Sequence, residues 1–143
     1  EGTALVTDLE QACVAIDELV QQIRRRVPEV VAEHRQRLLD RVAKVLETHQ
    51  TRLDDNDVIR EVALIADRSD ISEELVRLES HVEQFRSLLH DTAPGRSLDF
   101  LAQELGREAN TIGSKSVDVA IAHAVVDLKS QVERIREQAA NIE

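Results

Sequence analysis

The chain has 143 residues, contains no methionine, tryptophan or tyrosine, and has only two aromatic residues, Phe85 and Phe100. Proteins that recognise single-stranded nucleic acid by base stacking need several aromatic side chains on one surface. That mode of recognition is therefore nearly excluded. Because the initiator methionine is also missing, we expect the sequence to be a fragment or a processed form of a longer protein.

Cysteine and long apolar runs are equally scarce. Cys13 is the only cysteine and cannot form an internal disulfide, which fits a reducing compartment such as the cytoplasm. No run of about 18 apolar residues and no signal-peptide pattern is present, so we expect no membrane partner. The hydrophobic fraction of 42% is too high for disorder, and the net charge of -10 argues against a free-standing DNA-binding module.

Helix-forming residues dominate the chain, which has only 4 glycines and 2 prolines. Rich in Leu, Ala, Glu, Arg and Gln, this composition predicts an all-α protein. Apolar residues from Leu5 to Val45 recur in steps of four and three, the heptad pattern of a coiled-coil seam. Pro28 lies inside this pattern. Its missing N–H predicts either one kinked helix or two helices over about 2–27 and 28–50.

Turn signals divide the rest of the chain into shorter helices. The acidic run at 54–57 can cap a short helix, and Asp70 with Glu73 predicts a capping arrangement for the helix after it. The sequence at 90–95 is the strongest turn signal, and another helix is expected to end near Gly113. We predict a long kinked helical arm over residues 1–57, followed by an antiparallel helical bundle over residues 58–143.

A few apolar residues lie outside the predicted core stripes. Phe100 falls on a polar helix face, and Val119, Ala122 and Val126 form a second apolar patch on the last helix. A bundle of this size does not need these residues in its own core. They predict a further packing partner, either another subunit or another part of the same protein.

Basic residues are concentrated between Arg24 and Lys44. This segment has seven basic and three acidic residues, a net charge of +4 in an acidic chain. Two interpretations remain open. The segment is either a solvated helix with interspersed ion pairs or a contact surface for a polyanion.

Familiar catalytic motifs are missing: the sequence has no phosphate-binding glycine loop, HExxH, nucleophile elbow or CxxC. Cys13 and His34 both fall on the apolar seam and are expected to pack rather than react. On the helix that follows Ile71, Glu74, Arg77 and His81 share one flank. A solvated edge with an internal salt bridge is the simplest interpretation of that flank.

The residues from Ile71 onward nevertheless form a recognisable pattern. ISEELVRLESH at 71–81 is followed by GRSLDF at 95–100, Gln103–Glu104, REANT at 107–111 and Ser114–Lys115. This pattern closely resembles the C-terminal domain of the YicC-like family. The opening five residues and the ending from Ile135 to Glu143 also resemble that family, so the similarity covers the whole chain.

The resemblance implies a bacterial cytoplasmic protein of a family labelled stress-induced and described as metal-dependent endoribonucleases. Family members assemble as hexamers around an RNA-accessible cavity. They also carry an N-terminal region that contains strands and is about as long as this chain. Residues 1–57 would correspond to the end of that region. We therefore expect an RNA-binding homo-oligomer whose activity belongs to a longer parent.

The resemblance also implies roles for the matched polar residues. Cleavage of a phosphodiester needs an activated nucleophile, protonation of the leaving oxygen and neutralisation of charge. The candidate catalytic residues are His81, Glu74, Glu104 and Glu108. Carboxylates suit Mg²⁺ or Mn²⁺, and the candidate ligands are Asp99, Glu104 and Glu108. The candidate phosphate-binding residues are Arg77, Arg96, Arg107 and Lys115. Alternatively, these residues form ion-pair networks that hold helices and subunits in register.

Two classes of function therefore compete. The chain is predicted to be the C-terminal part of a metal-dependent endoribonuclease. The alternative is a non-catalytic helical scaffold that oligomerises and binds RNA or a protein partner, as the long heptad seam and the second apolar faces would allow.

Overall fold

A computed structural model describes residues 2–49, 54–91 and 95–141. Over these residues the chain consists of helices joined by short connections, and no strand occurs in this part of it. The helices are α1 (Gly2–His49), α2 (Asp55–Arg68), α3 (Ser72–Leu89), α4 (Gly95–Lys115) and α5 (Val119–Ala139). The all-α prediction is confirmed.

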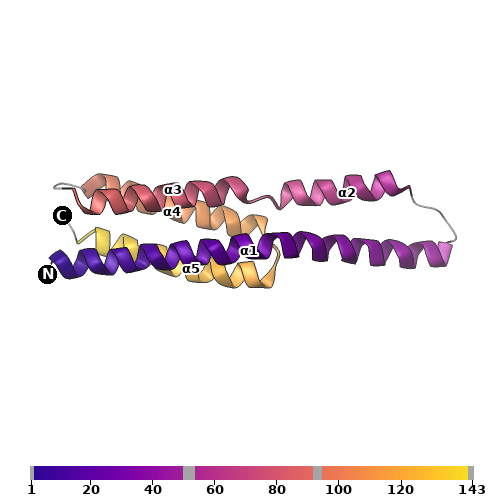
Figure 1. Ribbon diagram of the computed structural model, residues 1–143, viewed down its shortest axis with the longest axis horizontal. Coiled ribbons are helices and arrows are strands. Elements are labelled where there is room, and N and C mark those ends of the chain that lie inside the picture. Colours follow the sequence, from indigo (N-terminus) through magenta and orange to yellow (C-terminus); the bar gives the residue numbers. More distant parts are fainter. Residues whose placement is uncertain (1, 50–53, 92–94, 142–143) are drawn as a thin grey trace.

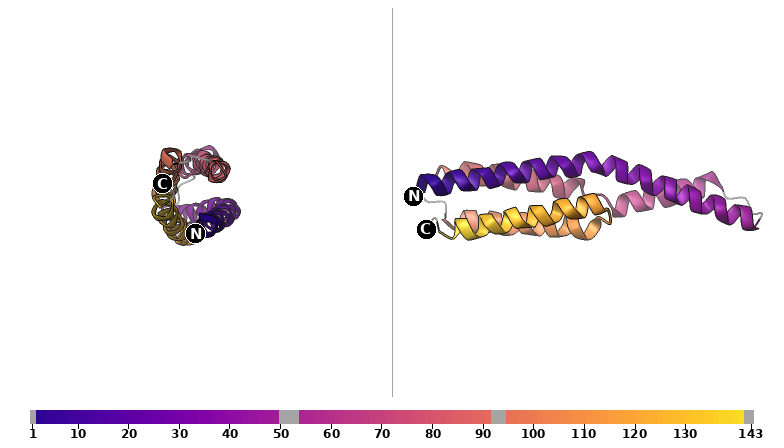
Figure 2. Two further views of the ribbon diagram at one scale, coloured as in Figure 1. Left: turned by 90° about the vertical axis from the view of Figure 1, so that its left-hand side faces the viewer. Right: turned by 90° about the horizontal axis from the view of Figure 1, so that it is seen from below.

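Four of these helices form an antiparallel bundle, and α1 continues beyond it (Figure 1). In the end-on view, α1, α5, α4 and α3 follow one another around the bundle axis (Figure 2). Each successive pair is in contact, and α1 also touches α3. Beyond the bundle, α2 runs back along the second half of α1 before the chain enters α3. We call the second half of α1 together with α2 the arm.

The apolar stripes predicted for the bundle helices meet in a single core. Phe85, Leu105 and Leu128, from three different helices, are fully buried there. On α1 the heptad pattern is confirmed from Leu9 to Ile23, which are both buried. Among the α1 side chains that the structure describes, the last buried one is Val30. The first half of α1 thus shares its core with residues of the predicted C-terminal bundle, and the division of the chain at residue 57 stays a prediction.

Pro28 lies inside α1, which continues through it as one helix. The alternative of two separate helices is therefore wrong. Pro28 is exposed, so the carbonyl that its missing N–H leaves free can be hydrated, and the helix can continue with a bend. Figure 2 shows that α1 is curved in its middle part.

An ion-pair cluster fixes α1 to α5 where the arm leaves the bundle. Arg26 donates from Nε and Nη2 to the carboxylate of Asp118, at 3.0 and 2.9 Å, and also pairs with Glu29 and Glu33. Asp118 in turn caps α5 by accepting a hydrogen bond from the Ile121 amide. The hydrogen bonds from Arg26 outweigh burial and hold the pKa of Asp118 below its usual value.

Aspartates cap the starts of α2 and α5, whereas the side chain of the N-cap residue of α3, Ile71, makes no capping hydrogen bond. Asp54 accepts a hydrogen bond from the Asn56 amide at the start of α2, which confirms capping by the acidic run. At α3 the predicted capping arrangement is only half correct. Asp70 accepts from the backbone and hydroxyl of Ser72, but Glu73 pairs with Arg77 one turn later. The following helix, α4, runs past Gly113 to Lys115.

A candidate metal centre between α3 and α4

Two helix faces bring the candidate residues together. Glu74, Arg77 and His81 are spaced three and four residues apart on α3, so they share one side of that helix. Glu104 and Glu108 are four residues apart on α4, which packs antiparallel to α3. As a result, one ligand atom from each of His81, Glu104 and Glu108 lies within 4.8 Å of the other two. We call these three residues the His–Glu–Glu group.

The His–Glu–Glu group is partly withdrawn from solvent. Glu108 is buried, while Glu104 and His81 are half-buried. The Nδ1 atom of His81 is itself inaccessible and has no hydrogen-bond partner among the described residues. Buried polar atoms in folded proteins are nearly always bonded, so a buried ring nitrogen without a partner in a histidine near two carboxylates is unusual.

Arg77 fixes the orientation of the deepest carboxylate. Its Nε atom donates to Oε1 of Glu108 at 2.9 Å, and its Nη atoms lie 3.4 Å from Glu73 and 3.6 Å from Glu74. The hydrogen bond to Glu108 is the main reason why the pKa of Arg77 is raised further. One oxygen of Glu108 is thus held by a permanent cation, and the side chain cannot turn freely within the group.

Glu74 and Lys115 form a second link between α3 and the end of α4. Glu74 is 3% exposed, and Lys115 donates from Nζ to its Oε1 at 2.7 Å. Burial raises the pKa of Glu74, but the hydrogen bond and charge of Lys115 outweigh it, so the pKa lies below its usual value. The second oxygen, Oε2, is buried without a partner among the described residues.

The candidate metal ligands are only partly gathered. Glu104 and Glu108 belong to the His–Glu–Glu group, but Asp99 does not. Asp99 is exposed and accepts a hydrogen bond from Gln103 on its own helix. Its role as a ligand stays a prediction without geometric support.

The candidate phosphate-binding cations differ in how free they are. Arg77 and Lys115 are engaged by the carboxylates of Glu108 and Glu74. The side chain of Arg107 is 75% exposed and forms a loose ion pair with Glu104 at 3.7 Å. The side chain of Arg96 lies outside the described part of the structure. Arg107 is therefore the cation best placed to meet a substrate beside the His–Glu–Glu group.

The resemblance implied one catalytic site for His81, Glu104 and Glu108, but it did not imply that His81 is a metal ligand. His81 was expected to act as an acid or base, and the carboxylates to bind the cation. The spacing of Glu104 and Glu108 is a signal for one shared helix face. Nothing in the spacing of residues within one helix, however, indicates which residue of another helix lies opposite.

The His–Glu–Glu group fits a divalent cation. Ligand bonds to such ions are about 2.0–2.6 Å long, so two ligands on opposite sides lie about 4–5 Å apart. The ligand atoms of the group lie within 4.8 Å of one another, so a cation between them could reach all three at such bond lengths. Carboxylates suit Mg²⁺ and Mn²⁺, whereas an imidazole nitrogen favours a transition metal. Of the two ions suggested by the sequence, Mn²⁺ therefore suits the group better.

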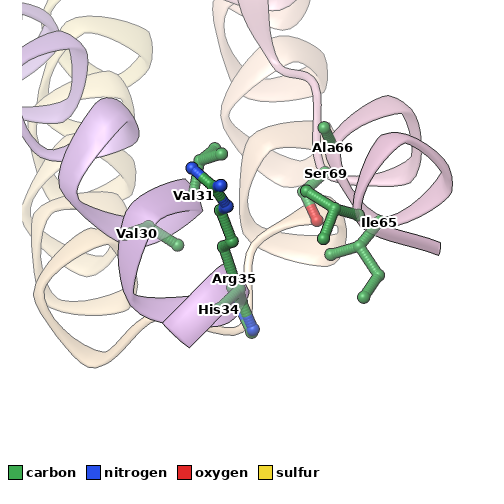
Figure 3. Close-up of a pocket in the computed structure, with 8 residues that line it drawn as sticks. Val30, Val31, His34, Arg35, Ile65, Ala66 and Ser69 are labelled. Atoms are coloured by element: carbon green, nitrogen blue, oxygen red, sulfur yellow. The ribbon is translucent and has the colours of Figure 1, made fainter. Parts of the chain in front are cut away.

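Another cavity lies between the two helices of the arm, near the bundle. It has room for about one water molecule, about 20 Å³, which is too small for a substrate. Figure 3 shows the side chains around it, with Val30, Val31, His34 and Arg35 on α1, and Ile65, Ala66 and Ser69 on the opposite segment. His34 is half-buried here, as expected for a packed residue.

None of the helices in the described part of the chain is long and apolar enough to cross a membrane.

Sequence comparison places these features in a family. A model of the family "Endoribonuclease YicC-like, C-terminal" matches residues 9–143. The chain is 41% identical to a probable endoribonuclease YicC of Clostridioides difficile and 40% identical to one of Haemophilus influenzae. Each match covers 100% of the chain and 49% of the relative, so the chain spans about half the length of these relatives. The chain belongs to the YicC-like family, in which it corresponds to the C-terminal domain.

Proposed function

We propose that this chain provides the metal-binding site of an endoribonuclease that cleaves RNA phosphodiester bonds. The observation that carries the proposal is the His–Glu–Glu group, in which two helices contribute three ligand atoms within 4.8 Å of one another. The relatives are named as probable endoribonucleases, which supports RNA as the substrate class. The reaction itself is proposed for the longer parent protein.

His81, Glu104 and Glu108 would hold the cation, which supplies charge neutralisation at the scissile phosphate and lowers the pKa of a bound water. Arg77 keeps Glu108 in one orientation, and this pre-organises the group before substrate arrives. Arg107 projects into solvent beside Glu104 and can donate to two non-bridging phosphate oxygens at once. In this arrangement Glu74 and Lys115 hold α3 and α4 in register and do not contact substrate.

His81 is assigned here as a ligand, not as an acid or base. The reason is its position: one of its ring nitrogens lies within 4.8 Å of an oxygen of each of the two carboxylates.

Binding of Mn²⁺ to the chain, followed by electron paramagnetic resonance or calorimetry, tests the site directly. We expect His81→Ala and Glu104→Gln each to weaken binding by more than about tenfold, because each removes one ligand. Glu61→Gln on α2 is the matched control, since Glu61 is an exposed glutamate outside the His–Glu–Glu group. Equal affinity of all four proteins would contradict the proposed metal centre.

Cleavage is tested on the full-length parent with labelled RNA, with and without a chelator. We expect the chelator and the double variant His81→Ala, Glu104→Gln to abolish cleavage. Undiminished cleavage by the double variant would remove these residues from the mechanism. RNA binding without any cleavage, in the parent supplied with Mn²⁺, would favour the alternative of a non-catalytic scaffold.

We also propose that the protein is a homo-oligomer, in line with the hexamer implied by the resemblance. Support comes from apolar side chains that the bundle leaves uncovered: Phe100 on α4 is 58% exposed, and Val126 on α5 is 67% exposed. Such residues are enriched at interfaces between subunits. Light scattering on the chain should detect a species larger than 16.1 kDa. A strictly monomeric species would contradict this part of the proposal.

A further inference from the structure

We propose that the groove between α4 and α5 binds the phosphates of an RNA strand that continues from the His–Glu–Glu group. This inference rests on the proposed function, because it extends the substrate beyond the bond to be cleaved. It assigns a role to Lys129 and Arg136 on α5, to which neither the family resemblance nor the proposed function gives one. The groove, hereafter the α4–α5 groove, has a volume of about 460 Å³.

The charge of the α4–α5 groove is opposite to that of the chain. The protein carries a net charge of -10, yet Arg107, Lys129 and Arg136 all line this groove. The side chain of Arg107 is mostly exposed and that of Arg136 is half exposed. Lys129 makes no ion pair within the described residues. The one carboxylate in the lining is Glu133, which lies 3.7 Å from Arg136. Three cations against one acid favour a polyanion as the occupant.

The remaining polar lining suits phosphate oxygens as well. Gln103 and Asn110 project from α4 into the same groove, and both are exposed. Their amide groups can donate hydrogen bonds without reading a base, as side chains commonly do in contacts with the nucleic acid backbone. A groove for an amphipathic helix presents large exposed apolar side chains, whereas the apolar residues that line this groove, Ala102 and Val132, are both buried.

Gly106 in the floor of the groove is not explained by packing. A Cβ atom added there would meet only Cγ1 of Val132, at an ordinary contact distance of 3.7 Å. At Gly113 on the same helix, an added Cβ would lie 3.1 Å from Cγ1 of Val125, so close packing explains that glycine. Glycine destabilises a helix interior relative to alanine. Gly106 therefore lowers the stability of α4, and close packing does not explain why a glycine stands there. An open floor that lets a backbone approach α4 is consistent with its position.

The α4–α5 groove is connected to the proposed metal centre through Arg107. Glu104 and Glu108 lie on the side of α4 that faces α3, whereas Gln103, Gly106 and Asn110 line the groove toward α5. Arg107 lines the groove and also pairs with Glu104 at 3.7 Å. A helix with its side chains is about 10 Å across. One strand crossing α4 over Arg107 can therefore reach both sites.

Titration of fluorescein-labelled single-stranded RNA with the chain, followed by anisotropy over a series of salt concentrations, tests the inference. We expect the double variant Lys129→Ala, Arg136→Ala to weaken binding about tenfold near physiological salt. For this variant, the slope of a plot of log affinity against log salt concentration should be less steep by about 1.4. That is the value for two lost phosphate contacts on a single strand. Glu133→Gln should strengthen binding by about threefold, because it removes the acid from the groove.

Matched variants separate the groove from net charge and from folding. Arg60→Ala with Arg68→Ala removes two cations from exposed positions on α2, outside the basic segment between Arg24 and Lys44, and should change the affinity less than twofold. Lys129→Arg with Arg136→Lys keeps the charge and should retain wild-type affinity. An equal loss in the groove and arm double variants would overturn the inference, because net charge alone would then explain binding. Unchanged affinity in the groove variant would overturn it too, and would leave the groove to a protein partner.

The inference and the proposed function fail in different ways. If the chain binds Mn²⁺ through His81 and Glu104 but the groove variant binds RNA normally, the groove inference is wrong and the proposed function stands. If Mn²⁺ binding is absent but the groove variant loses RNA affinity as described, the groove stands and the proposed function is wrong.

Discussion

The bundle and the arm are built from the same kind of amphipathic helix, but the bundle buries the apolar side chains of its helices far more completely than the arm does. The helices α3, α4 and α5 each contribute a full stripe of buried apolar residues to one core, together with the first half of α1. In the arm, α2 has no buried residue, and α1 has none among the residues described after Val30. Ile59 on α2 is 65% exposed although it belongs to an apolar face.

This difference shows what a helix needs besides an apolar stripe. A bundle helix has two neighbours, so its stripe is covered from both sides. The two helices of the arm have only each other over the described residues, and two cylinders side by side bury little more than the line along which they touch. The α2 helix therefore depends more on local interactions, such as the Asp54 cap and Asp55 and Asp57 in its first turn.

The largest expected effect comes from removing a core side chain of the bundle. Phe85 is fully buried, and Phe85→Ala should lower the free energy of unfolding by about 3–5 kcal/mol. The matched change in the arm, Ile65→Ala, removes a half-buried side chain and should cost about 1 kcal/mol or less. Urea denaturation followed by circular dichroism measures both. Equal losses would mean that the arm is as much a part of the stabilising core as the bundle.

A smaller effect is expected from the buried charge that joins α3 to α4. Lys115→Ala removes the closest cation from the buried Glu74, leaves the guanidinium of Arg77 at 3.6 Å, and should cost about 2 kcal/mol at neutral pH. The pKa of Glu74 is lowered below its ordinary value of 4.5 by folding. The unfolded chain therefore binds the proton more readily, and the stability from this pair is complete above pH 4.5 and lost as the pH falls through the folded pKa.

The pH dependence distinguishes the buried pair from an ordinary surface charge. The difference in unfolding free energy between wild type and Lys115→Ala should shrink as the pH is lowered below 4.5, because Glu74 then becomes protonated in both proteins. Lys44→Ala on the exposed part of α1 is the control and should show little cost at any pH. A constant difference between pH 3 and 7 would argue that Lys115 stabilises the bundle by packing instead of charge.

The contrast between bundle and arm also marks how far sequence alone could predict this fold. The heptad spacing correctly identified the apolar side of α1, and Leu9, Ala12 and Ile16 on that side are buried. The same spacing continues to Val31 and Val45, which are exposed. Periodicity shows which face of a helix is apolar, but the presence of a neighbour to cover it depends on tertiary packing. Pro28 likewise predicted a local break or bend in the helix. Its exposure to solvent, which lets α1 continue as one helix, depends on tertiary packing and could not be predicted.

The candidate site was predictable in its parts and not in its arrangement. Glu104 and Glu108 share a face because they are four residues apart, and this follows from helix geometry. Their meeting with His81 depends on the register of α4 against α3, which is set by side chains of the core. The same register pairs Arg77 with Glu108 and Lys115 with Glu74, two cations that the sequence had assigned to phosphate.

The smallest change in stability is expected from removing a helix cap. Each region has a capping aspartate, so the two can be compared. Asp54 caps α2 in the arm, and Asp118 caps α5 in the bundle, where it also pairs with Arg26. Loss of a capping aspartate costs about 1 kcal/mol of helix stability. Asp118→Ala should lower the global unfolding free energy by at least that amount, because α5 unfolds only with the core.

Asp54→Ala should instead act locally. We expect amide hydrogen exchange in α2 to become about fivefold faster, the equivalent of about 1 kcal/mol, with no change in the unfolding midpoint of the bundle. Nuclear magnetic resonance on the two variants reports both quantities residue by residue. If Asp54→Ala lowers the bundle's unfolding midpoint as much as Asp118→Ala does, the arm and the bundle unfold together. The arm would then be coupled to the core in spite of its exposed apolar face, most directly through α1, which runs through both regions.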